Sequence, residues 1–234
     1  MRLHVLSIAL CLVAAAGAVH AENLKEIQAR MDKTASDFKA MTASVVWTTH
    51  TAALNENSEE SGTVTLKRVR PGDIQGLVEF IKPDSKFVSL EKQRLAIYYP
   101  KTKTQDVWEL GEQADQLYQF LMIGFGTSGT ALAEKYNMKD LGKDTVKSSQ
   151  GIPTIRLQLV PKNGKIRENY VSRLELWIPV DGEPYPVQEK ISFPNSDDYR
   201  LVVYKDLRIN PALGADALQL KLPPGVHTEK HSGK

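Results

Sequence analysis

The sequence predicts a mainly β protein with some helix, in which a strongly curved antiparallel sheet of about nine to eleven strands faces an N-terminal and a central helical segment. Three observations predict this class. Apolar residues recur at every second position through most of the chain, as in strands that bury one face. Short turns rich in proline, glycine and asparagine separate these runs, as in an antiparallel meander. An early and a central stretch instead have the spacing of amphipathic helices.

The first residues have the features of a secretory signal peptide. A positive start at Arg2 precedes the apolar run Leu3–Val19, and small residues occupy the positions that signal peptidase recognises before Ala21. The run is shorter than the ~20 apolar residues of a membrane-spanning helix. We therefore expect residues 1–21 to be removed near Ala21, which leaves residues 22–234 as one exported domain.

Cysteine usage and charge narrow the class further. The single cysteine, Cys11, follows Leu10 inside the apolar run, so it lacks the context of a lipoprotein signal, and the mature chain is expected to have neither a disulfide nor a lipid anchor. The whole chain has a formal charge of only +2, with both signs interspersed. A nucleic-acid surface would show a basic stripe, so no nucleic-acid partner is expected.

An amphipathic helix is predicted over Asn23–Met41, and alternating strands follow it. The helix has apolar residues at three- and four-residue spacing, namely Leu24, Ile27, Met31, Ala35 and Phe38. The alternating runs are Val45/Trp47, Val64/Leu66, Val78/Phe80, Leu95/Ile97/Tyr99, Ile155/Leu157/Leu159, Leu174/Leu176/Ile178, Val187/Ile191/Phe193 and Leu201/Val203. This pattern predicts a sheet with one apolar and one polar face, covered on one side only.

The centre of the chain interrupts this pattern. Glu112–Ile123 and Thr130–Tyr136 are predicted to be helical, with Gly124, Gly126 and Gly129 between them. These glycines match the spacing of a dinucleotide-binding loop, but that loop works only between a strand and a helix. Here a helical segment precedes it, so the glycines are interpreted as a hinge for the central helices and no nucleotide is expected.

Catalytic and metal-binding patterns are not found in the sequence. The histidines after the signal peptide are His50, His227 and His231, and they show no metal-ligand spacing. A nucleophile elbow is not present, and a thiol nucleophile is excluded with no cysteine in the mature chain. The sequence therefore predicts a protein that is not an enzyme and that holds neither a cofactor nor a metal.

A curved sheet of this size exposes a large apolar face, for which two helical segments are a thin cover. The space between them is either a packed core or an apolar cavity, and the pattern alone leaves both open. Leucine, methionine and phenylalanine suit a cavity for flexible acyl chains because they are apolar and, for methionine, deformable. The candidate lining residues are Val45, Trp47, Val64, Leu66, Phe80, Ile97 and Tyr99 in the strands and Leu117, Phe120, Leu121, Met122 and Phe125 in the central segment.

The order of several short motifs resembles that of one family over nearly the whole mature chain. These motifs are Asn23–Phe38 leading into Met41–Trp47, Gly62–Pro71, Tyr98-Tyr99-Pro100, the central insert, Leu176-Trp177-Ile178 with Asp181-Gly182, and Leu220–Val226. The family is the LolA-like periplasmic carriers of outer-membrane lipoprotein sorting. The resemblance implies an incomplete antiparallel barrel around a hydrophobic cavity, closed by a lid of helices, that takes up lipoprotein acyl chains as a monomer. It also implies an inner-membrane ABC-type complex that loads the carrier and an outer-membrane acceptor.

The resemblance also implies a gating arginine. Family members commonly have an arginine before a proline at the end of an early strand, which ties the lid closed, and Arg70 before Pro71 matches that position. Arg68 lies two residues earlier on the same strand face and is the competing candidate. The wider superfamily also includes carriers of other lipids and envelope-stress sensors. A phospholipid, glycolipid or isoprenoid cargo, and a sensor or protein-interaction role, therefore stay open.

Overall fold

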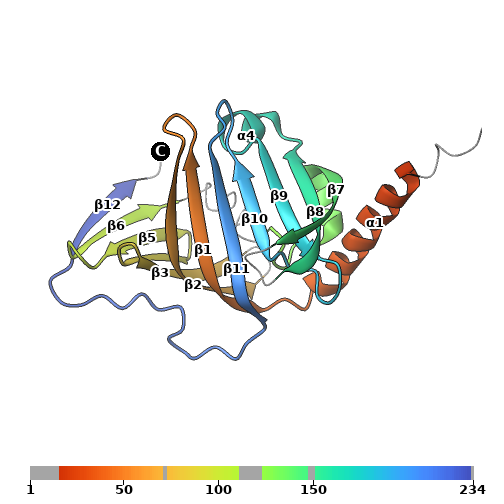
Figure 1. The fold of residues 1–234 in the computed structure, drawn as a ribbon. Coiled ribbons are helices and arrows are strands. Elements are labelled where there is room, and N and C mark those ends of the chain that lie inside the picture. The colour runs from red at the N-terminus through yellow and green to blue at the C-terminus, as the bar shows by residue number, and fades with distance from the viewer. Residues whose placement is uncertain (1–15, 71–72, 111–122, 147–150, 233–234) are drawn as a thin grey trace, which may run out of the picture.

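The computed structural model describes residues 16–70, 73–110, 123–146 and 151–232. Their secondary structure is mostly strand, with few helices (Figure 1). The elements are α1 (Ala16–Ala35), β1 (Ala40–Thr51), β2 (Glu56–Arg70), β3 (Asp73–Lys82), β4 (Lys86–Glu91), β5 (Arg94–Tyr99), β6 (Thr104–Glu109), α3 (Gly129–Lys135), β7 (Tyr136–Val146), β8 (Ile152–Pro161), α4 (Gly164–Asn169), β9 (Arg173–Pro179), β10 (Gln188–Ser192), β11 (Tyr199–Ile209) and β12 (His227–Ser232).

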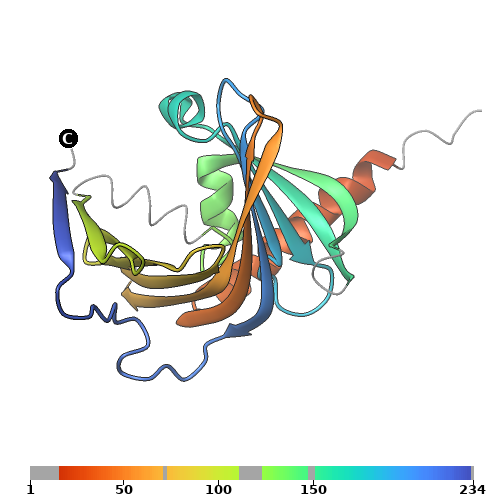
Figure 2. The ribbon, with the colours of Figure 1, turned by 60° about the vertical axis from the view of Figure 1, so that its left-hand side comes forward.

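All the described strands form one sheet, in the order β12-β6-β5-β4-β3-β2-β1-β11-β10-β9-β8-β7. Two antiparallel meanders, β1–β6 and β7–β11, are joined where β1 pairs with β11. Strand β12 then pairs in parallel with β6. The end strands β7 and β12 do not pair with each other, and the sheet curves without closing (Figures 1 and 2). The predicted fold class, a mainly β incomplete barrel, is confirmed, with twelve strands rather than nine to eleven.

The additional strands lack a clear apolar alternation. Strand β7, at one edge of the sheet, is largely polar (YNMKDLGKDTV), and β12, at the other edge, has the sequence HTEKHS. Edge strands are commonly polar because they bury less and must avoid pairing with other molecules. Strands β4 and β6 have only six residues each, so periodicity is a weak signal in them.

The N-terminal helix ends earlier than predicted. Helix α1 stops at Ala35 instead of Met41, because the chain turns to enter β1. The Asn210 side chain, at the end of β11, fixes this turn: its Oδ1 accepts hydrogen bonds from the Lys39 and Ala40 amides at 2.6 and 3.2 Å. The helix begins at Ala16 and so runs across the predicted cleavage site.

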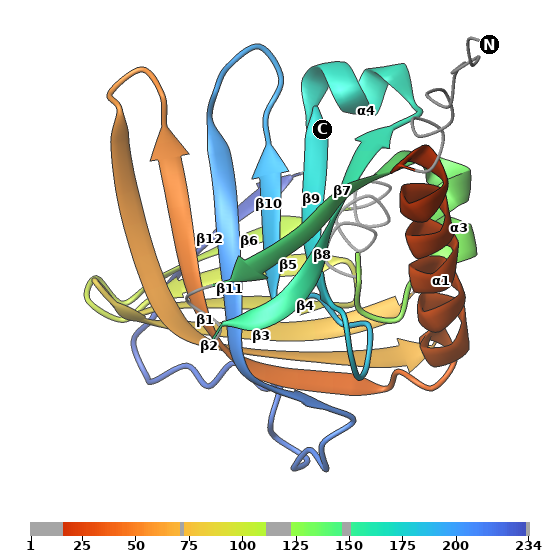
Figure 3. The same ribbon diagram turned by 45° about the vertical axis from the view of Figure 1, so that its right-hand side comes forward.

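Two apolar clusters lie on the face of the sheet that the helices cover, which we call the inner face. The first packs α1, α3 and the chain between β6 and α3 against β7–β9 (Figure 3), and Ile27, Met31 and Leu132 contribute from the helical side. The second lies on β1, β2 and β11. Its buried members are Phe38, Met41, Ala43, Val45, Val64, Leu66, Phe125, Tyr185 and Val202.

The opposite, outer face of the sheet is also buried in places, so the expectation of a sheet covered on one side only is wrong. On β5 and β6 the outward side chains Ala96, Tyr98 and Val107 are 2 to 5% exposed. The connection between β11 and β12 (residues 210–226) runs along this outer side from β11, in the middle of the sheet, to the β12 edge (Figures 1 and 2). The two-residue alternation therefore indicated where the strands lie, but not which of their faces is covered.

Candidate functional site

The inner face of strands β2–β6, which we call the arm, carries a row of apolar side chains that runs across β2–β5 and meets Asp106 on β6. Register places Val64, Val78, Val88 and Ile97 directly opposite one another across β2–β5. Directly opposed residues of an antiparallel sheet lie on the same face, so the row continues the face on which the second apolar cluster lies. Its further members on β5 and β6 are Leu95, Tyr99 and Trp108.

Val64 is buried, and beyond it the row is only half-buried. Val78, Val88, Ile97 and the further members are all of intermediate exposure. The outward row of the same strands, which includes Leu77 and Ala96, is buried instead. Half-buried apolar side chains in line along the inner face of a curved sheet are typical of a surface that receives an apolar ligand.

The structure brings most of the predicted lining residues onto this inner face. Val45, Val64, Leu66 and Phe125 are buried in the second cluster. Trp47 packs edge-on against Phe80 at 6.1 Å between ring centroids, and Phe80 is buried. Ile97 and Tyr99 lie half-buried on β5. The predicted residues Leu117, Phe120, Leu121 and Met122 lie outside the described residues.

The glycine loop (residues 124–129) reaches the inner face through aromatic contacts. The Phe125 ring lies 5.2 Å from the Tyr204 ring and 6.1 Å from the Tyr185 ring, and Phe38 lies 6.4 Å from it. Gly124 and Gly126 on either side have φ near +80°, a conformation that glycine adopts without strain. These two glycines allow the chain to turn on both sides of Phe125, so that the ring reaches the sheet.

Arg68 ties this loop to the N-terminal helix. It follows Val64 and Leu66 on the inner face, and its guanidinium donates hydrogen bonds to the Ala35 carbonyl, at 2.9 Å, and to the Gly126 carbonyl. The guanidinium also lies 5.5 Å from the centroid of the Phe38 ring. Desolvation lowers the pKa of Arg68, while the nearby Tyr185 raises it, and the group stays charged at neutral pH.

Arg70 occupies a different environment. The pairing between β2 and β3 shifts between Arg68 and Arg70, so the two-residue alternation is broken there. The Arg70 side chain is 77% exposed, and its Nε pairs with the Asp73 carboxylate at 3.2 Å. Of the two predicted gating arginines, Arg68 is therefore the one that contacts the glycine loop in the structure.

Glu189 on β10 is a buried carboxyl group that the sequence analysis missed. It lies opposite Val202 and Leu176, which belong to the two apolar clusters, so it faces inward between them. The Tyr204 hydroxyl is its hydrogen-bond partner, and burial raises the pKa of Glu189 to about 8. The signal was present in the sequence, because Glu189 shares the alternation of Ile191 and so occupies an apolar position in the strand.

The start of helix α3 is already occupied by protein groups. The Asp32 carboxylate of α1 accepts hydrogen bonds from the Thr130 amide and hydroxyl, both at 2.9 Å, and the Ser128 hydroxyl caps the Ala131 amide. A Cβ atom on Gly129 would lie 2.5 Å from the Gln28 Cα, so α1 and α3 cross closely there. This geometry agrees with the expectation that the glycine-rich spacing is not a nucleotide site.

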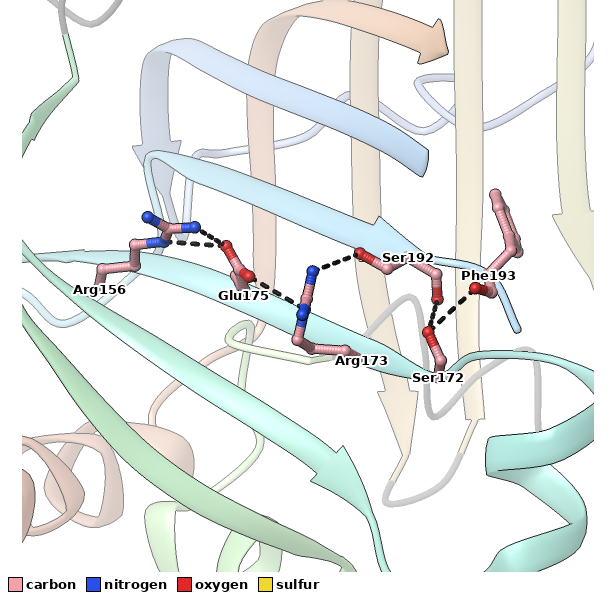
Figure 4. A network of polar contacts seen from close by, with 6 residues as sticks. All are labelled: Arg156, Ser172, Arg173, Glu175, Ser192 and Phe193. Carbon is pink, nitrogen blue, oxygen red and sulfur yellow. Dashed lines mark hydrogen bonds and ion pairs between the residues drawn. The ribbon is translucent and has the colours of Figure 1, made fainter. Parts of the chain in front are cut away.

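A polar network lies on the outer face of β8–β10 (Figure 4). The Glu175 side chain, 3% exposed, pairs with Arg156 and with Arg173, whose Nε lies 3.1 Å from the carboxylate. Arg156 also lies over the Trp177 ring, whose indole N–H donates to Asp144 at 2.9 Å and lowers the pKa of that carboxyl. Two guanidinium groups neutralise Glu175, so this network holds strands together and offers no free base.

A second polar cluster lies where β12 pairs with β6. Asp106, Glu229 and His231 have potential metal-ligand atoms within 4.8 Å of one another, which the spacing of residues in the sequence did not indicate. His231 Nε2 lies 3.0 Å from Asp106 Oδ1, and its ring stacks on Trp108 at 4.8 Å. The hydrogen bond and the stacking account for this arrangement, which joins β12 to the arm.

Neither the family models nor the curated proteins compared with this sequence match it. Among solved structures, the chain is similar to an uncharacterized conserved protein from Thermus thermophilus, with 13% identity over 89% of this chain and 99% of that chain and a TM-score of 0.51. It is also similar to LprF from Mycobacterium bovis, with 11% identity, coverages of 85% and 99%, and a TM-score of 0.51. A LolA superfamily protein from Nitrosomonas europaea matches at 11% identity, with coverages of 84% and 97% and a TM-score of 0.42.

The two similarities with a TM-score of 0.51, together with the unclosed curved sheet, show a likeness of fold to these solved structures. Identities of 11 to 13% show no more than that. Within the described part of the chain, no helix combines the length and the apolarity needed to cross a bilayer.

Proposed function

We propose that this protein is an exported, periplasmic carrier that shelters the acyl chains of lipoproteins, or of another envelope lipid, against the inner face of the arm. The observation that carries the proposal is the half-buried apolar row through Val78, Val88 and Ile97, on the face opposite the buried outward residues Leu77, Ala96 and Val107. The signal-peptide pattern of residues 1–21 supports export. Loading by an ABC-type complex and delivery to an outer-membrane acceptor remain part of the proposal through the LolA-like resemblance.

The energetics suit a carrier rather than a permanent store. Burying one CH₂ group contributes ~0.8 kcal/mol, so an acyl chain of about fifteen such groups gains on the order of 12 kcal/mol. A membrane offers nearly the same gain, and small differences in the protein therefore decide which of them holds the chain. The hydrogen bonds of Arg68 to Ala35 and Gly126 can make such a difference, because a hydrogen bond to a charged group contributes ~1.5–3 kcal/mol to the stability of the closed loop. We propose Arg68 as the gating residue.

The first test is native mass spectrometry of the exported protein purified from the envelope of its host. The expected result is a bound species of lipid mass that an added acylated peptide displaces, on a chain that begins near Glu22. A bare protein that also fails to bind a fluorescent fatty acid would contradict the carrier role. The polar outer face would then be examined as a sensor or protein-interaction surface.

A matched pair of substitutions locates the site. Ile97→Glu places a carboxylate in the apolar row and should weaken fatty-acid binding at least about tenfold, because a charge that must be desolvated opposes burial of the chain. Ile81→Glu makes the same chemical change at a position 62% exposed on β3, which lies near Ser44 and Lys205 rather than in the apolar row. It should bind like the parent. Equal binding by all three proteins, measured by fluorescence titration, would place the site elsewhere.

A further inference from the structure

Glu189 lies directly beneath the glycine loop. A Cβ atom on Gly124 would be 3.7 Å from Glu189 Oε1 and under 3 Å from the Pro186 ring, so the loop backbone packs closely over this carboxyl. Oε1 is buried and has no hydrogen-bond partner in the described part of the structure. A buried carboxyl oxygen without a partner costs free energy that is recovered when water reaches it.

The polar groups nearest to Glu189 and the loop are already engaged with other partners or are uncharged. Tyr204 on β11 hydrogen bonds to Glu189, and its ring packs on Phe125. Tyr185, between β9 and β10, interacts with the Thr34 hydroxyl and lies near the charges of Glu183, Asp37 and Arg68. Arg68 directs its guanidinium hydrogen bonds to Ala35 and Gly126.

The neighbouring strand β9 offers Glu189 no charged partner. The inward residue opposite Glu189 on β9 is the apolar Leu176, while Glu175 belongs to the outer network. Within the described residues, no cation therefore pairs with Glu189.

We propose that Glu189 makes opening of the glycine loop proton-linked: the loop is closed over the neutral carboxyl at low pH and opens as the pH rises. In the structure Gly124 packs over the carboxyl, and Phe125 packs on its hydrogen-bond partner Tyr204. Opening exposes it to water, where the carboxylate form is favoured. Each opening event in the neutral range therefore releases one proton.

The direction of the pH dependence of loop opening, and the pH range over which it acts, follow from the difference in the pKa of Glu189 between the closed and open loop. The pKa of Glu189 is about 8 in the closed loop, because of burial, against an ordinary value of 4.5 in water. The closed form thus binds the extra proton and is most stable below the ordinary value. As the pH rises above the ordinary pKa of 4.5, the equilibrium constant for opening of the loop increases by up to about tenfold per pH unit. This increase ends once the pH exceeds the closed-loop pKa of about 8.

The inference rests on the proposed function in one respect. The loop borders the inner face on which the acyl chain would lie, so proton-linked opening would favour entry and exit of cargo at higher pH and retention at lower pH. The loop movement itself is measurable in the lipid-free protein, which separates the two proposals.

The test is hydrogen exchange followed by mass spectrometry on peptides covering residues 123–135, from pH 5 to pH 8, in the lipid-free full chain. Glu189→Gln keeps the shape of the side chain and cannot ionise. Comparing it with the parent at each pH cancels the intrinsic pH dependence of exchange. We expect the ratio of opening constants, parent over variant, to rise on the order of 100-fold across this range. Glu183→Gln, a neighbouring exposed carboxylate, should follow the parent.

Parallel curves for the parent and Glu189→Gln would overturn the inference. A direct titration covers the case in which that variant folds poorly: the carboxyl carbon resonance of Glu189 in the parent should titrate well above the ordinary value of 4.5, and a midpoint near that value would also overturn it. Lipid binding with a pH-independent loop would leave the carrier role standing without this switch. A pH-dependent loop in a protein that binds no lipid would leave the switch standing without the carrier role.

Discussion

Two arginines two residues apart on β2 have different environments, and backbone pairing is the cause. Arg68 keeps the alternation of Val64 and Leu66 and so points inward, where two carbonyl groups accept its hydrogen bonds. The shift in pairing after Arg68 turns Arg70 to solvent and to Asp73. The sequence motif before Pro71 favours Arg70, whereas the side-chain alternation favours Arg68.

Arg68→Leu should lower the free energy of unfolding by about 1.5–3 kcal/mol, because two carbonyl groups lose a charged donor. Urea denaturation measures this loss, and hydrogen exchange should show faster opening of the glycine loop. The matched change Arg70→Leu should stay within about 0.5 kcal/mol of the parent, since its ion pair is exposed. Similar losses for both variants would remove the distinction between the two residues.

At the scale of elements, turns and edges carry features that the apolar pattern does not encode. The hairpin between β4 and β5 pairs Glu91 with Arg94 across a two-residue loop, Lys92-Gln93. Both loop residues have positive φ, 49° and 64°. A two-residue loop with positive φ at both positions is the type I′ turn, which asparagine and glycine favour. The strands on either side therefore hold Lys92 and Gln93 in a conformation that neither prefers.

Replacing this loop by Asn-Gly (Lys92→Asn with Gln93→Gly) should raise the free energy of unfolding by about 1 kcal/mol, because the new residues adopt positive φ at less steric cost. Thermal and urea unfolding of the double variant measure the gain. As a control, Ser85→Gly places glycine in a neighbouring turn at a residue without positive φ, where added freedom of the unfolded chain should give no gain. A double variant no more stable than the parent would contradict this account of the turn.

For the whole molecule, the sheet consists of two meanders whose stabilities depend on different contacts. The β7–β9 end packs on α1 and α3 through the first apolar cluster. The far end of the arm depends on β12, which pairs in parallel with β6 and adds the Thr228–Gln105 and His231–Asp106 hydrogen bonds. Local openings of the arm should therefore leave the helix-covered end intact.

Deleting residues 227–234 should make β6 an edge strand without unfolding the protein. Amides of β6 that bond to β12 lose their partners, so their hydrogen exchange should accelerate, while exchange in β8 and β9 stays as in the parent. A chain lacking only residues 233–234 is the control. Loss of protection throughout the sheet would show that the two meanders do not open separately.

The curved, unclosed sheet was predictable from sequence because most of its signals are local. Alternation marked β1, β2, β3 and β5, and helical spacing marked α1 and α3, with the end of α1 misplaced because Asn210, far along the chain, sets the turn after it. The polar edge strands β7 and β12 escaped detection because alternation reports burial and these strands bury little.

Periodicity within a few neighbouring residues was enough to predict the apolar strands, helices α1 and α3, and the apolar strand residues of the inner face. Other features arose from tertiary contacts. A shift in strand pairing directs Arg68 rather than Arg70 to the glycine loop, Glu189 lies beneath a loop from a much earlier part of the chain, and outward residues of the arm are buried. These outcomes depend on which distant segments meet, and the spacing of residues along one strand carries no information about that.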